Sequence, residues 1–195
     1  MRQPLSGIKV LDLGQIYQGP YCGMILSYLG ADVIKVEPPW GENIRTRTED
    51  GKPPQYQYLN PNKRGITLNF KEEEGHEAFR RLAEKADVNS ELVYAHGSGY
   101  GDDGPYADYP AMDLTVQAMS GAIHTTGFPD QKPVKAGPAI CDFFGGIHLV
   151  VGILAALFGR EFTGEGQYVE VGMFDCIYPT LASPVSSWVS EMDAP

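Results

Sequence analysis

The sequence predicts an α/β fold with a Rossmann-like parallel sheet and flanking helices. Residues 8–13 and 32–36 are short apolar runs, typical of buried strands. Residues 19–30 between them have helical character, and the glycine at their end, Gly30, is a common helix terminator. A strand, a helix and a second strand in such close succession form a βαβ unit, which requires parallel strands and a right-handed crossover.

The elements that follow continue to alternate. We interpret the polar stretch 38–61 as a loop, and a connection of that length inside a compact domain is usually functional. Asn69 stands three residues before Glu72, which is a capping-box pattern ahead of a helix. The stretch after Met173 is apolar but shows no clear closing element. The remaining elements are expected to be a strand over 65–70, a helix with Phe79, Leu82, Ala83 and Ala86 on one face, a strand over 92–96, a short helix over 113–119, an apolar helix over 143–160 that Gly164 ends, and a strand over 167–171.

Charge and cysteine usage exclude several classes of protein. The 195 residues include 15 Lys and Arg and 25 Asp and Glu, for a net charge of −10, which excludes nucleic-acid binding by general phosphate neutralisation. Three widely spaced cysteines without a CxxC exclude zinc-knuckle and thioredoxin-type motifs and favour a reduced, cytoplasmic compartment. The N-terminus lacks the apolar run of a secretory signal, and the longest apolar run, 143–158, is shorter than the roughly 20 residues that span a bilayer. We therefore expect neither a nucleic-acid nor a membrane partner.

Several familiar catalytic motifs do not occur in the sequence. The four histidines share no metal-ligand spacing and no HExxH is found, so no metal site is expected. A GxSxG nucleophile elbow is also missing. The segment GSGYGDDG matches neither GxGxxG nor a P-loop, and such glycine-rich segments are usually plain turns.

Asp142 directly precedes the most apolar predicted helix. As an N-cap, its carboxylate would accept hydrogen bonds from the first helical N–H groups. The helix dipole would also keep it ionised, and an accessible ionised carboxylate can be a covalent nucleophile. The residues alone leave both interpretations open.

Basic residues gather in and after the long loop of this acidic chain. They are either a receptor for an anionic ligand or solvated loop charges. These residues are Arg45, Arg47, Lys63, Arg64 and Lys71.

Six sequence blocks, in one order and covering most of the chain, resemble the class III coenzyme A transferases, the family of formyl-CoA:oxalate, carnitine and succinyl-CoA-dependent transferases. The blocks are PLSGIKVLDLGQIYQGP, LGADVIKVEPPWGENIR, NPNKRGITLNF, SGYGDDGPYADYPAMDLTVQAMSG, TTGFPDQKPVKAGPAICDFFGGIH and GILAALFGREFTGEGQYVEVGMFD.

The resemblance implies a covalent mechanism, because Asp142 matches the family's nucleophilic aspartate. Asp142 would attack an acyl-CoA thioester to give a mixed anhydride and then an aspartyl-CoA thioester, from which CoA passes to an acceptor acid. The implied partners are an acyl-CoA donor and a small carboxylic acid. CoA is then a substrate, and no permanently bound cofactor is expected.

The resemblance also implies contacts with CoA. One set lies in the turn after the first strand, and a second lies in the stretch from Leu68 to Lys71. Together with the basic cluster, this match places the CoA phosphates near Lys63, Arg64 and Lys71. Asp113 matches an acidic residue that family members place beside the nucleophile, whereas Pro38 replaces an arginine of formyl-CoA transferases. The residues of the first set are Gln15, Ile16, Tyr17 and Gln18.

The chain departs from the family pattern in two respects. After residues 86–88 the family continues through a strand and a helix with a CoA-contacting arginine, whereas here Asn89 follows directly. The chain also has about half the length of a typical member. Residues 1–195 are therefore expected to form part of the large, CoA-binding domain without the small domain. Because family members are interlocked dimers, we expect a homodimer or another homo-oligomer, formed through the apolar stretch 173–189.

Two alternatives to CoA transfer remain open. One is a truncated, catalytically silent relative that binds CoA or pairs with a fuller chain. The other is an acyl-CoA racemase of the same family, which needs a positioned base. Met112 occupies the position of the histidine beside the aspartate in racemases, and this favours transfer over racemisation.

Overall fold

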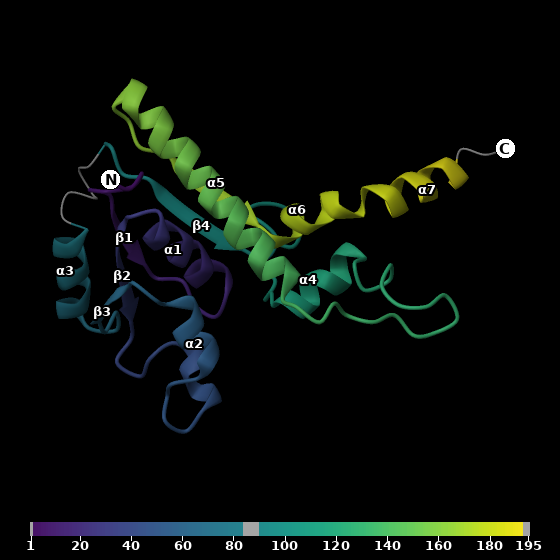
Figure 1. Cartoon of the computed structure of the whole chain (residues 1–195), viewed down its shortest axis with the longest axis horizontal. Coiled ribbons are helices and arrows are strands. Elements are labelled where there is room, and N and C mark those ends of the chain that lie inside the picture. The colour runs from purple at the N-terminus through teal and green to yellow at the C-terminus, as the bar shows by residue number, and fades with distance from the viewer. Residues whose placement is uncertain (1, 84–89, 193–195) are drawn as a thin grey trace. The chain divides into compact units, whose positions relative to one another are not determined.

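The chain folds into two compact units, which a computed structural model describes over residues 2–83 and 90–192. The first unit comprises residues 1–94 and 150–169, and the second comprises residues 95–149 and 170–195. Helices α1–α7 and strands β1–β4 are labelled in Figure 1.

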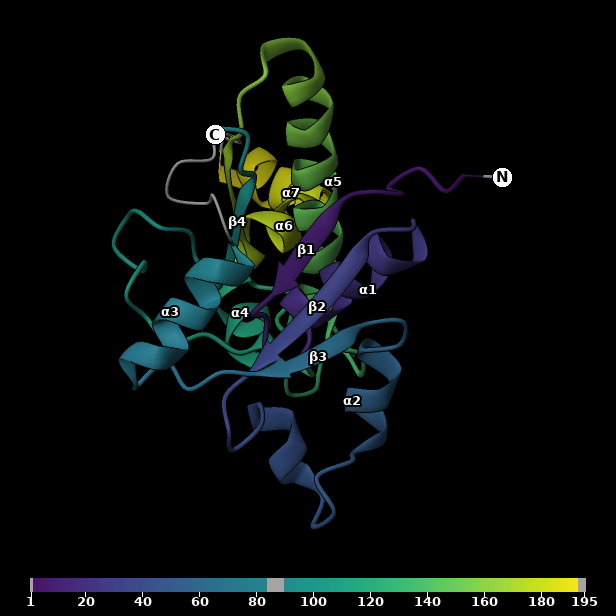
Figure 2. The same ribbon diagram turned by 90° about the vertical axis from the view of Figure 1, so that its left-hand side faces the viewer.

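A three-stranded parallel sheet of order β1-β2-β3 is the frame of the first unit. Its strands are β1 (Lys9–Asp12), β2 (Asp32–Glu37) and β3 (Arg64–Thr67). Helix α1 (Gln18–Tyr28) connects the first two strands and lies against one face of the sheet (Figure 2). The predicted α/β class and βαβ unit are confirmed, and the bounds of these elements differ from the predicted ones by at most three residues.

Helix α1 ends as its sequence predicts. The Leu29 amide donates to the Ile25 carbonyl oxygen, and Gly30 then takes a φ of 101°, a conformation that residues with a Cβ rarely adopt. Pro20 lies in the first turn, where its missing N–H leaves no hydrogen bond unmade. Leu26 is 1% exposed and anchors the buried side of the helix.

The segment 38–61 is not the loop that we predicted, because it contains two short helices. They are η1 (Asn43–Arg47) and α2 (Pro54–Leu59). Neither carries an apolar periodicity long enough to be recognised in the sequence, and the contacts that hold them come from the end of β2.

Glu37, the last residue of β2, ties both short helices to the sheet. Its carboxylate accepts hydrogen bonds from Arg45 Nε at 2.6 Å, from Arg45 Nη2 at 2.9 Å and from the Tyr56 hydroxyl at 2.6 Å. The Arg45 guanidinium also stacks 3.6 Å from the centroid of the Tyr56 ring. Burial opposes the ionisation of Glu37, but the hydrogen bonds from Arg45 and Tyr56 lower its pKa to about 2.

Helix α3 (Glu73–Leu82) begins without the predicted capping box. Glu72 stands at the N-cap position, and no side chain caps the helix. The Asn69 side chain instead accepts the Lys71 backbone N–H at 3.1 Å, a local turn that competes with capping. Ala86, which we predicted on the same helical face as Phe79, lies outside the described residues.

The strands β4 (Tyr94–Ser98) and β5 (Tyr168–Gly172) form a separate two-stranded sheet. Both were predicted, although β4 lies two residues later than expected. The single sheet that we predicted is therefore divided into two sheets. In the first unit, the Tyr94 and Tyr168 rings stack at a centroid distance of 5.5 Å.

Helices build the core of the second unit. They are α4 (Asp113–Ser120), the start of α5 (Ile140–Thr163), α6 (Met173–Ile177), η2 (Tyr178–Leu181) and α7 (Ala182–Met192). The stretch after Met173, for which the sequence showed no closing element, is thus helical. The buried cluster consists of Val116, Ala122, Cys141, Met173, Ile177 and Leu181.

Helix α5 (Ile140–Thr163) is longer than its predicted bounds and contributes to both units. Gly164 follows it with a φ of 69°, as expected for a terminator. By length and composition alone its 24 residues suffice to cross a membrane, which corrects the length argument based on residues 143–158. Core helices of globular proteins pass the same test, and length therefore excludes neither setting.

Candidate functional site

The first group of candidate residues lies at the carboxyl edge of the three-stranded sheet. Gln15–Gln18 follow β1, and Leu68–Lys71 follow β3. Since the three strands are parallel and paired in register, the loops after them leave the same edge. Open parallel sheets bind ligands at that edge. The fold thus brings two predicted CoA-binding segments to one side of the sheet.

Two glycines allow the tight turn between β1 and α1. A Cβ on Gly14 would lie 2.6 Å from the Cα of Gly19, so that neither position accepts a side chain without movement of the backbone. Between them, Ile16 has a φ of 64°. A β-branched residue is strained in this left-handed region, and such strain concentrates at functional sites.

A buried ion pair supports this turn from beneath. The Lys35 ammonium donates to the Gly14 carbonyl oxygen and to Glu42 Oε2, the latter at 3.0 Å. The Lys35 and Glu42 side chains are 2% and 1% exposed. Burial raises the pKa of Glu42, and the charge of Lys35 opposes that shift. This pair was not predicted, because lysine and glutamate usually face solvent and the two residues carry no pairing motif.

The side chains of the turn differ in their hydrogen-bond partners. Gln15 accepts a hydrogen bond from the Asn43 side chain at 3.0 Å, and the Tyr17 hydroxyl accepts one from Arg47 at 2.8 Å. Gln18 is 8% exposed, and its side-chain Nε2 has no hydrogen-bond partner within the described part of the chain. Buried polar groups usually have a partner, so the amide of Gln18 is a candidate hydrogen-bond donor to a ligand.

Lys63 does not lie where a phosphate could reach it. Its ammonium donates to Asp12 Oδ2 at 2.8 Å, to the Pro20 carbonyl oxygen at 2.7 Å and to Asn60 Oδ1 at 2.8 Å. The Lys63 side chain is 1% exposed and that of Asp12 is 5% exposed. All three ammonium donors therefore have protein acceptors. We correct the predicted phosphate contact and assign Lys63 a structural role.

The other predicted cation sites remain at the surface. Arg64 forms a two-bond ion pair with Asp32 on the neighbouring strand, at 2.9 Å and 2.6 Å. Lys71 is exposed, and its ammonium lies 4.7 Å from the centroid of the Trp40 ring. Leu68 is buried and donates its backbone N–H to the Glu37 carbonyl oxygen. Both cations are thus exposed, Arg64 in an ion pair and Lys71 beside an aromatic face.

Asp142 lies in the second unit and is 8% exposed. Helix α5 begins at Ile140, so Asp142 is its third residue and not its N-cap, which was one of the two interpretations left open by the sequence. The Ala139 carbonyl oxygen accepts the Phe143 N–H at 3.1 Å, which is the first bond of the helical ladder. In the first turn, the carboxylate of Asp142 still lies where the helix dipole favours negative charge.

Asp113, at the start of α4, caps the first turn of α5 in place of Asp142. Its Oδ1 accepts the backbone N–H groups of Cys141 at 2.8 Å and of Asp142 at 3.4 Å. Its Oδ2 accepts the side-chain N–H of Gln117 at 2.6 Å. Asp113 was expected to lie beside Asp142. Its carboxylate in fact holds the backbone N–H of Asp142 by a hydrogen bond and so helps to fix the position of that residue.

The carboxylates of Asp113 and Asp142 both act on the neighbouring thiol of Cys141. Burial raises the pKa of the neighbouring Cys141 thiol to about 12, with further contributions from the Asp113 and Asp142 carboxylates. A thiol with so high a pKa is not the nucleophile at neutral pH. Of the two neighbouring side chains, Asp142 therefore stays the candidate nucleophile.

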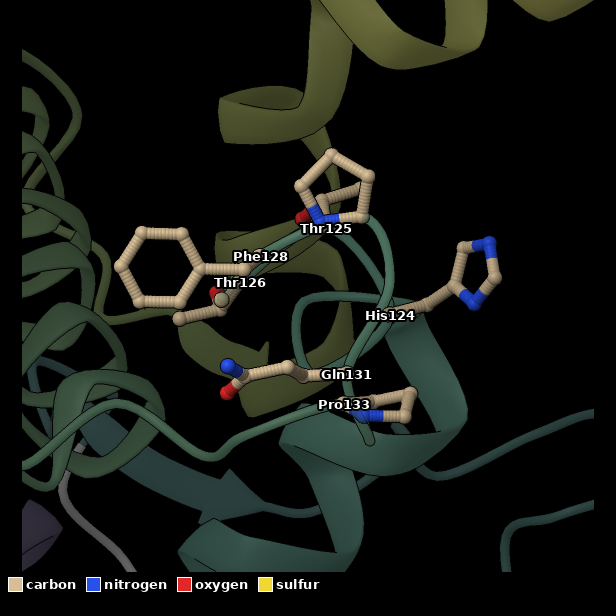
Figure 3. A pocket seen from close by; sticks show the side chains of 8 residues that line it. His124, Thr125, Thr126, Phe128, Gln131 and Pro133 are labelled. Carbon is tan, nitrogen blue, oxygen red and sulfur yellow. The ribbon is translucent and has the colours of Figure 1, made fainter.

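A pocket of about 290 Å³ lies in the loop between α4 and α5 (Figure 3). The hydroxyls of Thr125 and Thr126 donate to the Ala122 carbonyl oxygen at 3.1 Å and 2.7 Å. None of the lining residues is acidic, lysine or arginine, so we assign it neither a phosphate nor a carboxylate. The lining residues are His124, Thr125, Thr126, Gly127, Phe128, Pro129, Gln131 and Pro133.

Within residues 2–83 and 90–192, no group of three or more His, Cys, Asp or Glu side chains is arranged to hold a metal ion.

Curated relatives of the chain are CoA-transferases. It is 41% identical over 199 residues to formyl-CoA:oxalate CoA-transferase of Streptomyces avermitilis, covering 89% of this chain and 48% of the relative. It is 36% identical over 220 residues to acetyl-CoA:oxalate CoA-transferase of Acetobacter aceti, covering 98% of this chain and 56% of the relative. The chain thus spans about half the length of these relatives.

The alignments also indicate a gap inside the chain. Because 89% of its 195 residues is about 174, about 25 of the 199 positions aligned with the Streptomyces protein have no residue here. The profile of the family described as CoA-transferase family III matches in two stretches, residues 5–91 and 88–195. The stretches meet where the sequence predicts a missing strand and helix.

A solved structure agrees with these matches. The crystal structure of a CAIB/BAIF family protein from Brucella suis has a TM-score of 0.90 and 34% identity, covering all of this chain and 60% of that protein. The family profile covers nearly the whole chain, and the fold matches that of a solved relative over the full length of this chain. The chain belongs to CoA-transferase family III.

Proposed function

We propose that the protein transfers CoA from an acyl-CoA to a carboxylic acid, with Asp142 as the covalent nucleophile. The observation that carries the proposal is the position of Asp142 in the first turn of α5, with the backbone N–H groups of that turn held by Asp113. Such a carboxylate is fixed in place, and the helix dipole favours its ionised form. The activities in the names of the curated relatives are of this class.

The exchange then proceeds in four acyl transfers. A carboxylate oxygen of Asp142 attacks the thioester carbonyl, the C–S bond breaks, and CoA leaves as thiolate from a mixed anhydride. The thiolate attacks the aspartyl carbonyl, which releases the donor acid and leaves an aspartyl-CoA thioester. The acceptor carboxylate attacks that thioester and expels the thiolate again. Attack of the thiolate on the acceptor's carbonyl gives the new acyl-CoA and regenerates Asp142.

We further propose that the carboxyl edge of the three-stranded sheet binds CoA. Support comes from the unpartnered amide of Gln18, the strained Ile16, and the accessible Lys71 beside Trp40. Gln15 and Tyr17 complete the turn, and Leu68 directly follows β3. Arg64 is the first residue of β3 and lies at the other end of that strand. CoA enters this proposal as a substrate. A cytoplasmic location and a homodimer belong to the same proposal, the latter because Trp188 and Val189 on α7 are 62% and 45% exposed.

The gap at residues 88–91 favours a second candidate, a chain that binds CoA without turning it over. The missing positions correspond in number to a strand and a helix. A racemase has less support, because Met112 supplies no base beside Asp113.

Replacement of the nucleophile separates the two candidates. The chain is incubated with formyl-CoA or acetyl-CoA and oxalate, and CoA exchange and the intact mass are followed. We expect Asp142→Asn and Asp142→Ser to stay folded and to lose exchange by several orders of magnitude, because neither can form the anhydride. Asp108→Asn, an exposed control in the same unit, should retain full exchange.

Hydroxylamine trapping identifies the residue that reacts. During turnover it should convert Asp142, and no other residue, to a hydroxamate that peptide mass analysis detects. Exchange by a folded Asp142→Asn chain, shown by mass not to have deamidated, would refute the mechanism. Binding of CoA by the unaltered chain without any adduct or exchange would establish the silent candidate instead.

A further inference from the structure

Gln117 is 0% exposed. It connects α4 with the loop at Ala136 directly and with the start of α5 through Asp113. It lies on α4, one turn after Asp113. Its side-chain Nε2 donates to Asp113 Oδ2 at 2.6 Å, and its Oε1 accepts the Ala136 backbone N–H at 2.9 Å. Asp113 in turn holds the first turn of α5. One buried amide therefore connects the loop that approaches α5 with the carboxylate that caps it.

We propose that Gln117 is a positioning residue for the reaction of Asp142. It fixes the orientation of the Asp113 carboxylate and thereby the backbone of Asp142, and it anchors the loop at Ala136. The inference rests on the proposed function, because it assigns Gln117 a role in the chemistry of that site. Nothing in the motif that carries Asp142 pointed to Gln117, which lies 25 positions earlier in the sequence.

The chemistry of the two partners determines which side chain fits. A carboxylate can only accept, and a backbone N–H can only donate, so the side chain between them must offer a donor on one arm and an acceptor on the other. A primary amide does so at every pH. A carboxyl group does so only while it is protonated. An ionised glutamate at this position would repel Asp113 and turn its carboxylate away from the N–H groups of α5.

Loss of this orientation should affect catalysis strongly. Reacting groups must be held close to the attack geometry, and a displacement of about 1 Å can reduce a rate about 100-fold. With Oδ2 fixed by Gln117 and Oδ1 fixed by Cys141 and Asp142, the Asp113 carboxylate cannot rotate without breaking a hydrogen bond. Removal of the Gln117 contact frees that rotation.

The variant Gln117→Glu tests the inference through its pH dependence. Burial beside Asp113 should keep the new carboxyl group protonated in mildly acidic solution and ionised at pH 8. Amide hydrogen exchange at Cys141 and Asp142, measured by NMR, should be faster than in the unaltered chain at pH 8 after correction for intrinsic rates, and should match it near pH 5. Formation of the Asp142 adduct should fall on the order of 10- to 100-fold at pH 8 and recover near pH 5. Gln131→Glu, an exposed control, should change neither readout at either pH.

A second variant covers the case in which Gln117→Glu does not fold at pH 8. In Asp113→Asn with Gln117→Glu, the asparagine oxygen can accept the N–H groups of α5 while its amide donates to the glutamate. This pair should restore slow amide exchange at Cys141 and Asp142 at pH 8.

Two results would overturn the positioning role: protection in Gln117→Glu that equals the unaltered chain at pH 8, or failure of the paired variant to restore it. Hydrogen exchange does not require turnover, so it tests the positioning role even if the unaltered chain forms no adduct. The absence of an adduct in the unaltered chain would refute the proposed function alone. Equal adduct formation by the unaltered chain and Gln117→Glu at both pH values would refute the positioning role while the proposed function stands.

Discussion

Lys63 and Arg64 are adjacent cations whose removal should have very different effects on stability. Lys63 is buried with three acceptors, and Arg64 pairs with Asp32 in solvent, where the two side chains are 62% and 46% exposed. We therefore compare Lys63→Met with Arg64→Met. Both replace a long cationic side chain with an uncharged one of similar reach.

The expected magnitudes follow from what each substitution leaves behind. Lys63→Met leaves the Asp12 carboxylate, 5% exposed, without its counter-ion, and breaking a buried pair in this way costs about 3–5 kcal/mol. Two further acceptors, on Pro20 and Asn60, also lose their donor. Arg64→Met removes an exposed pair, for which the cost is below about 1 kcal/mol.

Urea unfolding followed by circular dichroism measures both free energies. Neutralising the remaining charge with Asp12→Asn in the Lys63→Met chain should recover stability, because Asn keeps the acceptor that the Gly14 backbone N–H uses at 2.8 Å. We expect a coupling energy of at least about 1 kcal/mol between the two substitutions. If Lys63→Met costs no more than Arg64→Met, or if the cycle shows no coupling, the structural role of Lys63 is wrong and its role in phosphate binding returns.

Three further predictions concern the same unit. Because the pKa of Glu37 is about 2 in the fold against an ordinary 4.5, its ionisation stabilises the fold above pH 4.5. This stability should be lost as the pH falls from 4.5 to 2, by about 3 kcal/mol relative to Glu37→Gln in acid titrations of unfolding. Gly14→Ala should lower the free energy of unfolding by about 1–3 kcal/mol, and Gly65→Ala, with open space at its Cβ and an ordinary φ, should cost less. Lys71→Ala should weaken binding of CoA by about tenfold in calorimetry and of 3′-dephospho-CoA by less, and equal losses would argue against a contact with the 3′-phosphate.

The sequence predicts the βαβ unit well because its signals are local. Apolar runs mark β1 and β2, and Gly30 ends the helix between them through its own backbone freedom. The short helices after β2 carry no such signal. Their stability comes from tertiary contacts with Glu37, and weak local propensity is readily overridden by such contacts.

In the candidate site, too, the residues with a local sequence signal were predicted and the roles that depend on distant contacts were not. Asp142 is recognisable from its own segment, but the residue that caps its helix, Asp113, stands 28 positions before the first N–H that it accepts. Lys63 was misassigned because its partner Asp12 lies 51 positions away, and a lysine beside an arginine resembles a surface cluster until the fold is known. Gln117 gave no signal at all, since a single buried amide has no sequence pattern.

A single missing strand explains both the gap at residues 88–91 and the position of β1 at the edge of its sheet. In a doubly wound sheet of order 3-2-1, the next strand along the chain pairs with the free edge of β1. Within the described residues β1 pairs with β2 alone, and the about 25 positions missing relative to the Streptomyces protein are enough for one strand and one helix. A strand at that place would add a further loop to the carboxyl edge, where we propose that CoA binds. The network of Asp113, Gln117 and Asp142 lies in the other unit and is complete without it. The gap should therefore weaken the affinity for CoA more than it alters the nucleophile. Adduct formation, measured over a range of acyl-CoA concentrations, tests this prediction. A silent chain forms no adduct at any concentration, whereas a chain with weakened affinity forms it at high acyl-CoA concentration.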